Sequence, residues 1–121
     1  MTDEITKKII GAAIEVHQIL GPGLLESVYE EALCHEFGLR AIGFERQFAV
    51  DVYYKNCVIS SQRLDLLVED EVVVEIKSLR NLPEVAMAQV LSYLKATGLK
   101  RGLIVNFGEK QLINGIKRIS L

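Results

Sequence analysis

Two apolar segments separated by three acidic residues constrain the fold of this chain most strongly. Residues 63–68 read RLDLLV, residues 72–77 read VVVEIK, and Glu69-Asp70-Glu71 connects them. Short runs rich in Val, Leu and Ile that are joined by a tight connection predict two neighbouring strands. The second run is so apolar that we expect it to lie in the buried centre of a sheet.

This strand pair carries three charged residues. Side chains alternate between the two faces of a strand, so Glu75 and Lys77 project together on one side. Pairing of the strands carries Asp65 back toward them. A buried charge costs free energy unless it has a partner or a function, which favours a functional site here. The alternative is a half-exposed strand on which Glu75 and Lys77 simply face water.

Helical spacing of apolar residues predicts two helices before these strands. The first begins after Thr2 as its cap, carries Asp3 and Glu4 in its first turn, and ends at Gly21-Pro22-Gly23. The second runs from about Leu24 to Phe37 and is stopped by Gly38. Its expected inner face consists of Leu25, Val28, Tyr29, Ala32 and Leu33.

The rest of the chain predicts further strands and one more helix. From Phe44 to Val52 the period is two, with Phe44, Phe48 and Val50 on one face, and Lys55-Asn56 predicts a hairpin turn into 57–59. Asn81-Leu82-Pro83 opens a third helix that reaches about Ala96 and is closed by Gly98. Residues 103–107 form a buried strand, whereas 113–121 indicate a turn followed by a strand or a helical piece. We therefore expect a single α/β domain over residues 1–121.

Composition excludes several classes of protein. Half of the 121 residues are apolar, which is enough for a core. Cys34 and Cys57 lack metal-ligand spacing and predict two reduced, mostly buried thiols. With only His17 and His35 present, neither a zinc site nor Cys/His nucleophilic chemistry is expected, and His17 is interpreted as structural. The sequence contains no apolar run long enough to span a membrane and no signal peptide, so we expect a cytoplasmic protein.

Charge is unevenly distributed along the chain. The net charge is −2, but residues 1–75 hold six Lys or Arg against fourteen Asp or Glu, whereas residues 76–121 hold eight against two. Such polarity is compatible with a basic face for phosphates beside carboxylates around a metal. It is also compatible with ordinary solvated helix faces.

The residue types in the strand pair suit phosphodiester hydrolysis with Mg²⁺ (or Mn²⁺). This ion is usually held by one or two carboxylates with several waters left in place. Asp65 and Glu75 supply such oxygens, and the backbone carbonyl of Ile76 lies between Glu75 and Lys77. Lys77 would orient the attacking water or stabilise the phosphoryl oxygens.

Other polar residues are candidates for contact with a nucleic acid. Arg46 and Arg63 lie in strand patterns, where each guanidinium would reach phosphate or pair with Glu45 or Asp65. Gln89 and Tyr93 are four residues apart and share a face of the third helix. A structural place beside the apolar stripe of that helix is favoured for Tyr93.

Several motifs together resemble those of the PD-(D/E)xK nuclease-like superfamily and, within it, the small bacterial and archaeal GxxExxY proteins. The resemblance runs from about residue 10 to residue 119. The motifs are Gly23-Leu24-Leu25-Glu26-Ser27-Val28-Tyr29 with Gly21-Pro22 before it, Arg63–Val68, Glu75-Ile76-Lys77 and Gln89–Leu94.

The resemblance implies a fold and a set of roles. The fold would be α/β with a restriction-endonuclease-like core, a central mixed four- or five-stranded sheet flanked by helices. Asp65 and Glu75 would be metal ligands, with Ile76 beside them, and Lys77 the catalytic lysine. Glu26 would be the additional acid over the metal, and Gln89 would complete the site. The residues alone offer another interpretation of Glu26, as an acid placed by the helix dipole.

The function expected first is Mg²⁺-dependent hydrolysis of DNA. A homodimer or a protein partner is expected as well, since a domain of this size has little surface for gripping a duplex. The alternative is a non-catalytic module that binds nucleic acid or protein on the same scaffold. A third hypothesis is metal-dependent chemistry on a nucleotide or RNA.

Overall fold

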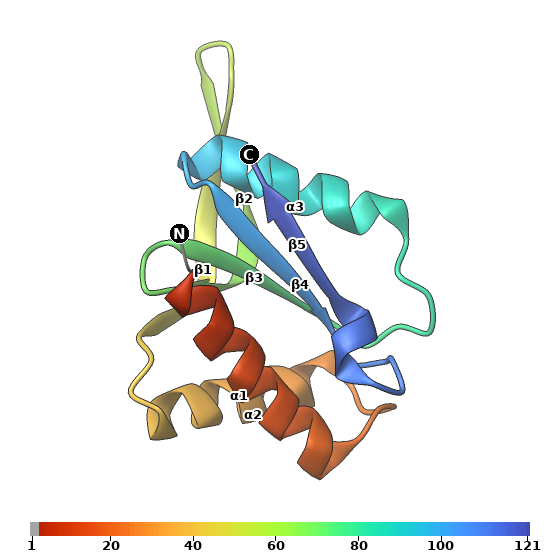
Figure 1. Cartoon of the computed structure of the whole chain (residues 1–121). Helices are drawn as coiled ribbons and strands as arrows, with labels where there is room; N and C mark the ends of the chain where they lie inside the picture. Colours follow the sequence, from red (N-terminus) through yellow and green to blue (C-terminus); the bar gives the residue numbers. More distant parts are fainter. Residues whose placement is uncertain (1–2) are drawn as a thin grey trace.

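The computed structural model of this protein describes residues 3–121 (Figure 1). Its elements in chain order are α1 (Glu4–Leu20), α2 (Glu26–Leu39), β1 (Phe44–Tyr54), β2 (Cys57–Val68), β3 (Val72–Lys77), α3 (Glu84–Thr97), β4 (Arg101–Asn106), the 3-10 turn η1 (Leu112–Gly115) and β5 (Ile116–Ser120). The predicted order of elements is therefore confirmed, and the unsettled tail is a turn followed by a strand.

The strands form one five-stranded sheet in the order β1-β2-β3-β4-β5. Neighbouring strands are antiparallel except β3 and β4, which are parallel. A parallel pair needs a long crossover, and α3 supplies it by running from the end of β3 back to the start of β4. The expectation of an α/β fold with a central mixed sheet flanked by helices is confirmed.

The helices cover the sheet on both faces (Figure 1). Helices α1 and α2 pack on one face over an apolar cluster that includes Leu66, Val74 and Val105. Helix α3 covers the other face over a second cluster that includes Val73 and Ile104. Nearly every residue of β3 and β4 is buried, because helices cover both faces of these strands, as predicted.

Strands β1 and β2 do not keep one face throughout. Phe44 packs under α1 and α2, whereas Phe48 and Val50 pack under α3, although a simple period of two places all three together. The change occurs at Gln47, whose φ of 50° is left-handed. That conformation turns the strand over locally, so the predicted single face of 44–52 is wrong.

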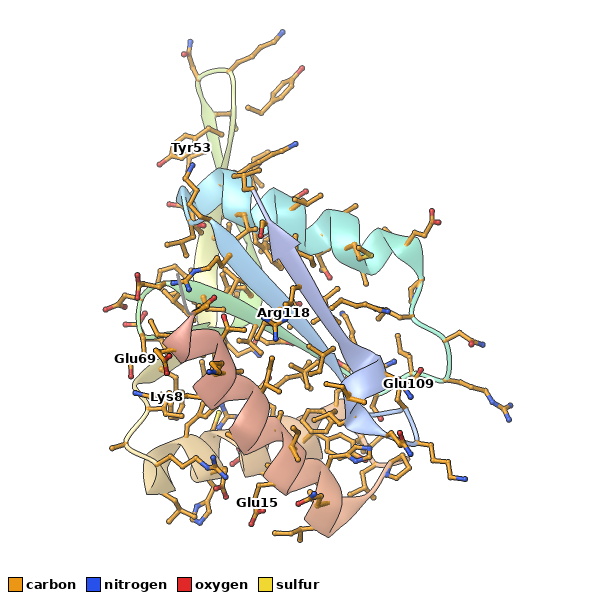
Figure 2. All side chains as sticks on the ribbon, in the orientation of Figure 1. Lys8, Glu15, Tyr53, Glu69, Glu109 and Arg118 are labelled. Atoms are coloured by element: carbon orange, nitrogen blue, oxygen red, sulfur yellow. The ribbon has the colours of Figure 1, made fainter. Side chains whose placement is uncertain are left out.

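The β1–β2 hairpin projects beyond the rest of the molecule, and Figure 2 shows Tyr53 on it. The predicted turn at Lys55-Asn56 is confirmed, with Lys55 in a left-handed conformation. The strand after the turn continues unbroken to Val68 as one strand. Cys57 is exposed on this hairpin, so its predicted burial is wrong, whereas Cys34 is buried as expected.

Helix α2 differs from the prediction in its inner face and its end. Leu25 and Val28 are 74% and 40% exposed, whereas Phe37 and Cys34 are buried with Tyr29 and Leu33. The helix is rotated relative to the predicted stripe because Tyr29, Leu33 and Phe37 anchor it at helical spacing. Gly38 does not stop the helix, which continues to Leu39.

The remaining sequence predictions concern the N-terminal helix. The predicted cap Thr2 lies outside the described residues. Asp3, expected in the first turn, is the N-cap, and its carboxylate accepts a hydrogen bond from the Thr6 amide. His17 is buried, and its Nε2 lies 2.8 Å from the carbonyl oxygen of Glu109, a structural role as predicted. None of the helices within residues 3–121 has the length and apolar character needed to cross a membrane.

Candidate active site

The antiparallel pairing of β2 and β3 ends just before the predicted acids. Backbone pairs join Leu66–Val68 to Val72–Val74 and go no further. Beyond them, Glu75 Oε2 accepts a hydrogen bond of 2.7 Å from the Asp65 amide, and Asp65 Oδ2 accepts one of 2.8 Å from the Ile76 amide. Two side chains thus replace the backbone ladder, and they bring the two carboxylates together.

Burial and like charge make this carboxylate pair costly. Glu75 is 3% exposed, and burial followed by the Asp65 charge raises the pKa of its carboxyl to about 7. Burial likewise raises the pKa of Asp65, although the hydrogen bond from Ile76 opposes the shift. The structure therefore holds two carboxylates where a positive charge would stabilise both ionised forms.

Lys77 supplies part of that positive charge. It lies two residues after Glu75 on the same strand and is half-buried. Its ammonium lowers the pKa of both Glu75 and Asp65, so it acts on both carboxyls. Among residues 3–121 it forms no direct ion pair, which leaves the ammonium available to a ligand.

A buried tyrosine holds the turn that precedes α2. The Tyr29 hydroxyl donates a hydrogen bond of 2.5 Å to the Gly21 carbonyl and accepts one of 3.1 Å from the Leu24 amide. Its ring stacks on Phe107 at 4.4 Å between centroids. Gly23 has a φ of 101°, a conformation that a side chain at this position would disfavour. The spacing of Gly23 and Tyr29 thus has a structural cause.

This turn places Glu26 near the end of β3. The Ser78 hydroxyl, one residue beyond Lys77, donates a hydrogen bond of 2.5 Å to the Leu24 carbonyl. Glu26 is the exposed first residue of α2, and its charge contributes to the raised pKa of Glu75. The predicted acid therefore lies within electrostatic range of the carboxylate pair.

Gln89 and Tyr93 reach the site from α3. Gln89 Nε2 donates a hydrogen bond of 3.1 Å to the Tyr93 hydroxyl, which donates one of 3.3 Å to the Arg63 carbonyl. Burial raises the pKa of Tyr93, and the charges of Glu75 and Asp65 raise it further, so the hydroxyl lies within electrostatic range of both carboxylates. Because Tyr93 is only 3% exposed, its position argues against the predicted direct contact with nucleic acid.

The two arginines predicted to contact nucleic acid bind protein groups. Arg46 forms ion pairs with Glu30 at 2.8 Å and with Glu31 at 2.9 Å, both on α2. The Arg63 guanidinium donates to the Gln47 carbonyl at 3.2 Å. The alternative pairings with Glu45 and Asp65 are therefore wrong, because α2 and the turned strand β1 lie closer.

Glu30 and Gln47 belong to the site but were absent from the sequence prediction. Gln47 Nε2 donates to Glu30 Oε1 at 3.0 Å and lies 3.5 Å from Asp65 Oδ1. Glu30 follows Glu26 by four residues, so helical spacing was an available signal. Gln47 had no such signal, since its position depends on the register of β1 against β2.

Asn106 is a further polar residue that the prediction missed. It is 1% exposed at the end of β4, beside Lys77 in the parallel register. Its Oδ1 accepts hydrogen bonds from the Leu79 and Gly108 amides, and its Nδ2 donates to the Leu79 carbonyl. It therefore ties the chain just after Lys77 to the neighbouring strand. The signal was an amide within the apolar run 103–107.

The donors at the site fit a hard divalent cation. Glu75 Oε1 accepts no hydrogen bond from residues 3–121. Every fully buried side-chain oxygen in that range has a hydrogen-bond partner, so Oε1 is not fully buried and reaches solvent. The same range contains no group of three His, Cys, Asp or Glu side chains arranged to hold a metal. Two carboxylates together with water are a donor set that Mg²⁺ commonly takes.

Comparisons with known proteins place this chain in a family. The model of the PD-(D/E)XK nuclease superfamily matches residues 3–119, whereas a search of curated proteins finds no significant match. The crystal structure of SSO0001 is similar, with a TM-score of 0.50 and 16% identity over 96% of this chain and 77% of that chain. At this identity the likeness shows the fold alone. The five-stranded mixed sheet flanked by helices, together with the family match, is consistent with the expected restriction-endonuclease-like core. Since the family model covers nearly the whole chain, this protein belongs to the PD-(D/E)XK nuclease superfamily.

Proposed function

We propose that this protein is a Mg²⁺-dependent nuclease that hydrolyses phosphodiester bonds in DNA, with Mn²⁺ as a substitute ion. The observation that supports this most is the reciprocal pair of hydrogen bonds between the Asp65 and Glu75 segments, because it holds two carboxylates side by side. Membership of a nuclease superfamily supports the reaction class.

We also assign the chain to the GxxExxY proteins within that superfamily. The residues of the motif have separate tasks in this structure. Gly23 permits the turn, Tyr29 fastens it, and Glu26 begins α2 near the carboxylate pair. These separate roles support the proposal that the motif forms one side of the candidate site.

The roles proposed for the candidate residues combine their positions with the resemblance to the superfamily. Asp65, Glu75 and the Ile76 carbonyl would hold the ion, and Glu26 would bind one of its waters. When bound, Mg²⁺ supplies charge neutralisation at the phosphate and a water of lowered pKa. Lys77 stabilises negative charge on the phosphoryl oxygens, and Gln89 orients the attacking water.

The DNA itself would be held by residues outside the carboxylate pair. Arg63 is exposed on β2, and Arg46 lies on β1, although both contact protein groups in the free structure. A duplex is long relative to a single chain of this size. We therefore also propose that a second copy or a protein partner completes the binding surface.

Metal binding is tested before any substrate is chosen. Calorimetric titration with Mn²⁺ is expected to give saturable binding to the wild type and at least tenfold weaker binding to Glu75→Gln and Asp65→Asn, about the loss typical of a damaged metal site. Glu45→Gln on exposed β1 is the matched control and should bind like the wild type. Equal binding by all four proteins would place the ion elsewhere.

Cleavage is tested with linear, nicked, branched and single-stranded DNA, together with RNA. Lys77→Ala is expected to keep its Mn²⁺ affinity and to lose cleavage, whereas Lys117→Ala on β5 should retain both. Equal cleavage by the wild type and Lys77→Ala would indicate a contaminating nuclease. Tight binding of nucleic acid without cleavage by the wild type would instead support the non-catalytic module, and cleavage confined to RNA would support the third hypothesis.

A further inference from the structure

Gln47 has an unusual backbone conformation in the middle of a strand. Its backbone φ is 50°, a value that residues other than glycine, asparagine and aspartate rarely adopt. The residues on either side pair normally with β2, Arg46 with Leu66 and Phe48 with Leu64. Gln47 therefore lies directly across from Asp65, where the residues of β1 change from the face under α1 and α2 to the face under α3. Strained backbone of this kind often accompanies a functional site.

Three hydrogen bonds hold Gln47 in this conformation. Its carbonyl oxygen accepts from the Arg63 guanidinium at 3.2 Å. Its Nε2 donates to Glu30 Oε1 at 3.0 Å and lies 3.5 Å from Asp65 Oδ1. Glu30 is itself fastened by Arg46, which binds its Oε2 through Nε and Nη2 at 3.2 and 2.8 Å. The Gln47 amide is thus fixed on one side by α2 and faces Asp65 on the other.

The contacts of Asp65 divide between its two oxygens. Oδ2 accepts from the Ile76 amide, which lies on β3. Oδ1 faces the Gln47 amide at 3.5 Å, which is the one hydrogen bond that this oxygen accepts from a side chain within residues 3–121. Rotation of the carboxylate about its Cβ–Cγ bond moves both oxygens together. A donor at Oδ1 therefore restrains Oδ2 as well, and it keeps the Ile76 bond in place.

We propose that Gln47 is a positioning residue that sets the orientation of the Asp65 carboxylate for the divalent cation. This inference rests on the proposed function for its metal, but the orientation itself is a property of the metal-free protein. Glu30 holds the Gln47 amide and Arg46 holds Glu30, and neither of them forms a hydrogen bond with Asp65. The side chain of Gln47, and not only its backbone, is what the site requires.

Substitution by glycine separates the side chain from the backbone. Gln47→Gly removes the side-chain amide, and glycine adopts the left-handed φ without steric strain. Ala49→Gly places the same glycine two residues away on exposed β1, where glycine weakens an ordinary strand. The pair thus controls for the general cost of glycine in β1.

Two measurements test the proposal, one of them without metal. Hydrogen exchange by nuclear magnetic resonance in the metal-free protein is expected to show faster exchange of the Ile76 amide in Gln47→Gly at unchanged unfolding midpoint. In Ala49→Gly, the protection of the Ile76 amide should fall by no more than the global free energy of unfolding of that variant falls. Calorimetry should show about tenfold weaker Mn²⁺ binding for Gln47→Gly and wild-type binding for Ala49→Gly. A loss of this size is typical when a group that orients a metal ligand is removed.

The outcomes distinguish this inference from the proposed function. Wild-type protection of Ile76 in Gln47→Gly, or equal loss in both glycine variants, would overturn the positioning role. If the wild type binds no Mn²⁺ but Ile76 still loses protection in Gln47→Gly alone, the metal-dependent function fails while the orientation of Asp65 by Gln47 stands. Unchanged Mn²⁺ affinity in Gln47→Gly would show that the orientation is not used for the ion.

Discussion

Asp65 and Glu75 lie on neighbouring strands and complete each other's hydrogen bonding at the point where the strands separate. The Glu75 carboxylate accepts from the Asp65 amide, and the Asp65 carboxylate accepts from the amide that follows Glu75. Each bond satisfies a backbone donor that the ended ladder would otherwise leave unpaired. The same bonds hold two acidic groups in a buried position, so the stability of the sheet and the chemistry of the site depend on the same atoms.

The raised pKa of Glu75 predicts that stability falls as pH rises. Burial raises this pKa from 4.5 to about 7, so the folded state binds the proton more tightly than the unfolded state. The stabilisation is fully present below about 4.5 and is lost as pH rises through about 7. We expect a loss on the order of 1–3 kcal/mol in the metal-free protein. Urea unfolding across this range should show a flatter profile for Glu75→Gln, whereas Glu45→Gln should keep the wild-type slope.

Divalent cations should stabilise the folded protein. A ligand that binds only the folded state raises the protein's free energy of unfolding by mass action. The increase is about 2.7 kcal/mol when the free ligand concentration is one hundred times the dissociation constant. Thermal unfolding with excess Mg²⁺ or Mn²⁺ is expected to give a higher midpoint, which chelation with EDTA reverses. Glu75→Gln should show no such shift. A shift of equal size in Glu75→Gln would mean that the cation binds outside the carboxylate pair.

Loss of the Tyr29 hydroxyl should destabilise the fold. Tyr29→Phe keeps the stacked ring but leaves the Gly21 carbonyl and the Leu24 amide without their partner. We expect a cost of about 1–3 kcal/mol in the free energy of unfolding by urea. Tyr54→Phe on the exposed hairpin is the control and should be near neutral. A neutral Tyr29→Phe would show that the turn before α2 holds itself without the hydroxyl.

Asn106 should be among the residues most sensitive to substitution. Asn106→Ala leaves both backbone groups of Leu79 and the Gly108 amide unpaired at a buried position. The expected cost in unfolding free energy is about 2–4 kcal/mol. Asn81→Ala, at an exposed position after β3, should change stability by no more than about 0.5 kcal/mol. Similar values for the two variants would contradict a structural role of the Asn106 amide.

The strand pair and the end of α3 could be predicted because local chemistry decides them. Apolar runs separated by Glu69-Asp70-Glu71 form paired strands, and Gly98 ends α3 in a left-handed conformation. The convergence of Asp65 and Glu75 followed from the pairing of these runs. Such features depend on neighbours close in sequence, so periodicity and turn residues are sufficient to find them.

The face of a residue was predictable only where the strand or helix is regular. Gln47 turns β1 over, so Phe44 and Phe48 enter different clusters, and no residue type at this position announces that turn. The inner face of α2 was mispredicted because Leu25 and Val28 are apolar yet exposed. A one-residue change in conformation or a small helix rotation exchanges buried and exposed positions, and only packing against the whole core decides it.

The sequence by itself determined which residues carry the charge of the site, since Asp65, Glu75 and Lys77 stand out as ionisable groups within apolar strands. The tertiary structure alone decided what surrounds them. Gln47 on β1 joins Asp65 to Glu30 on α2, and the buried Tyr93 lies within electrostatic range of the pair. The physical reason is distance along the chain: these contacts depend on strand register and helix docking, which the free energy of the entire core sets and no local pattern records.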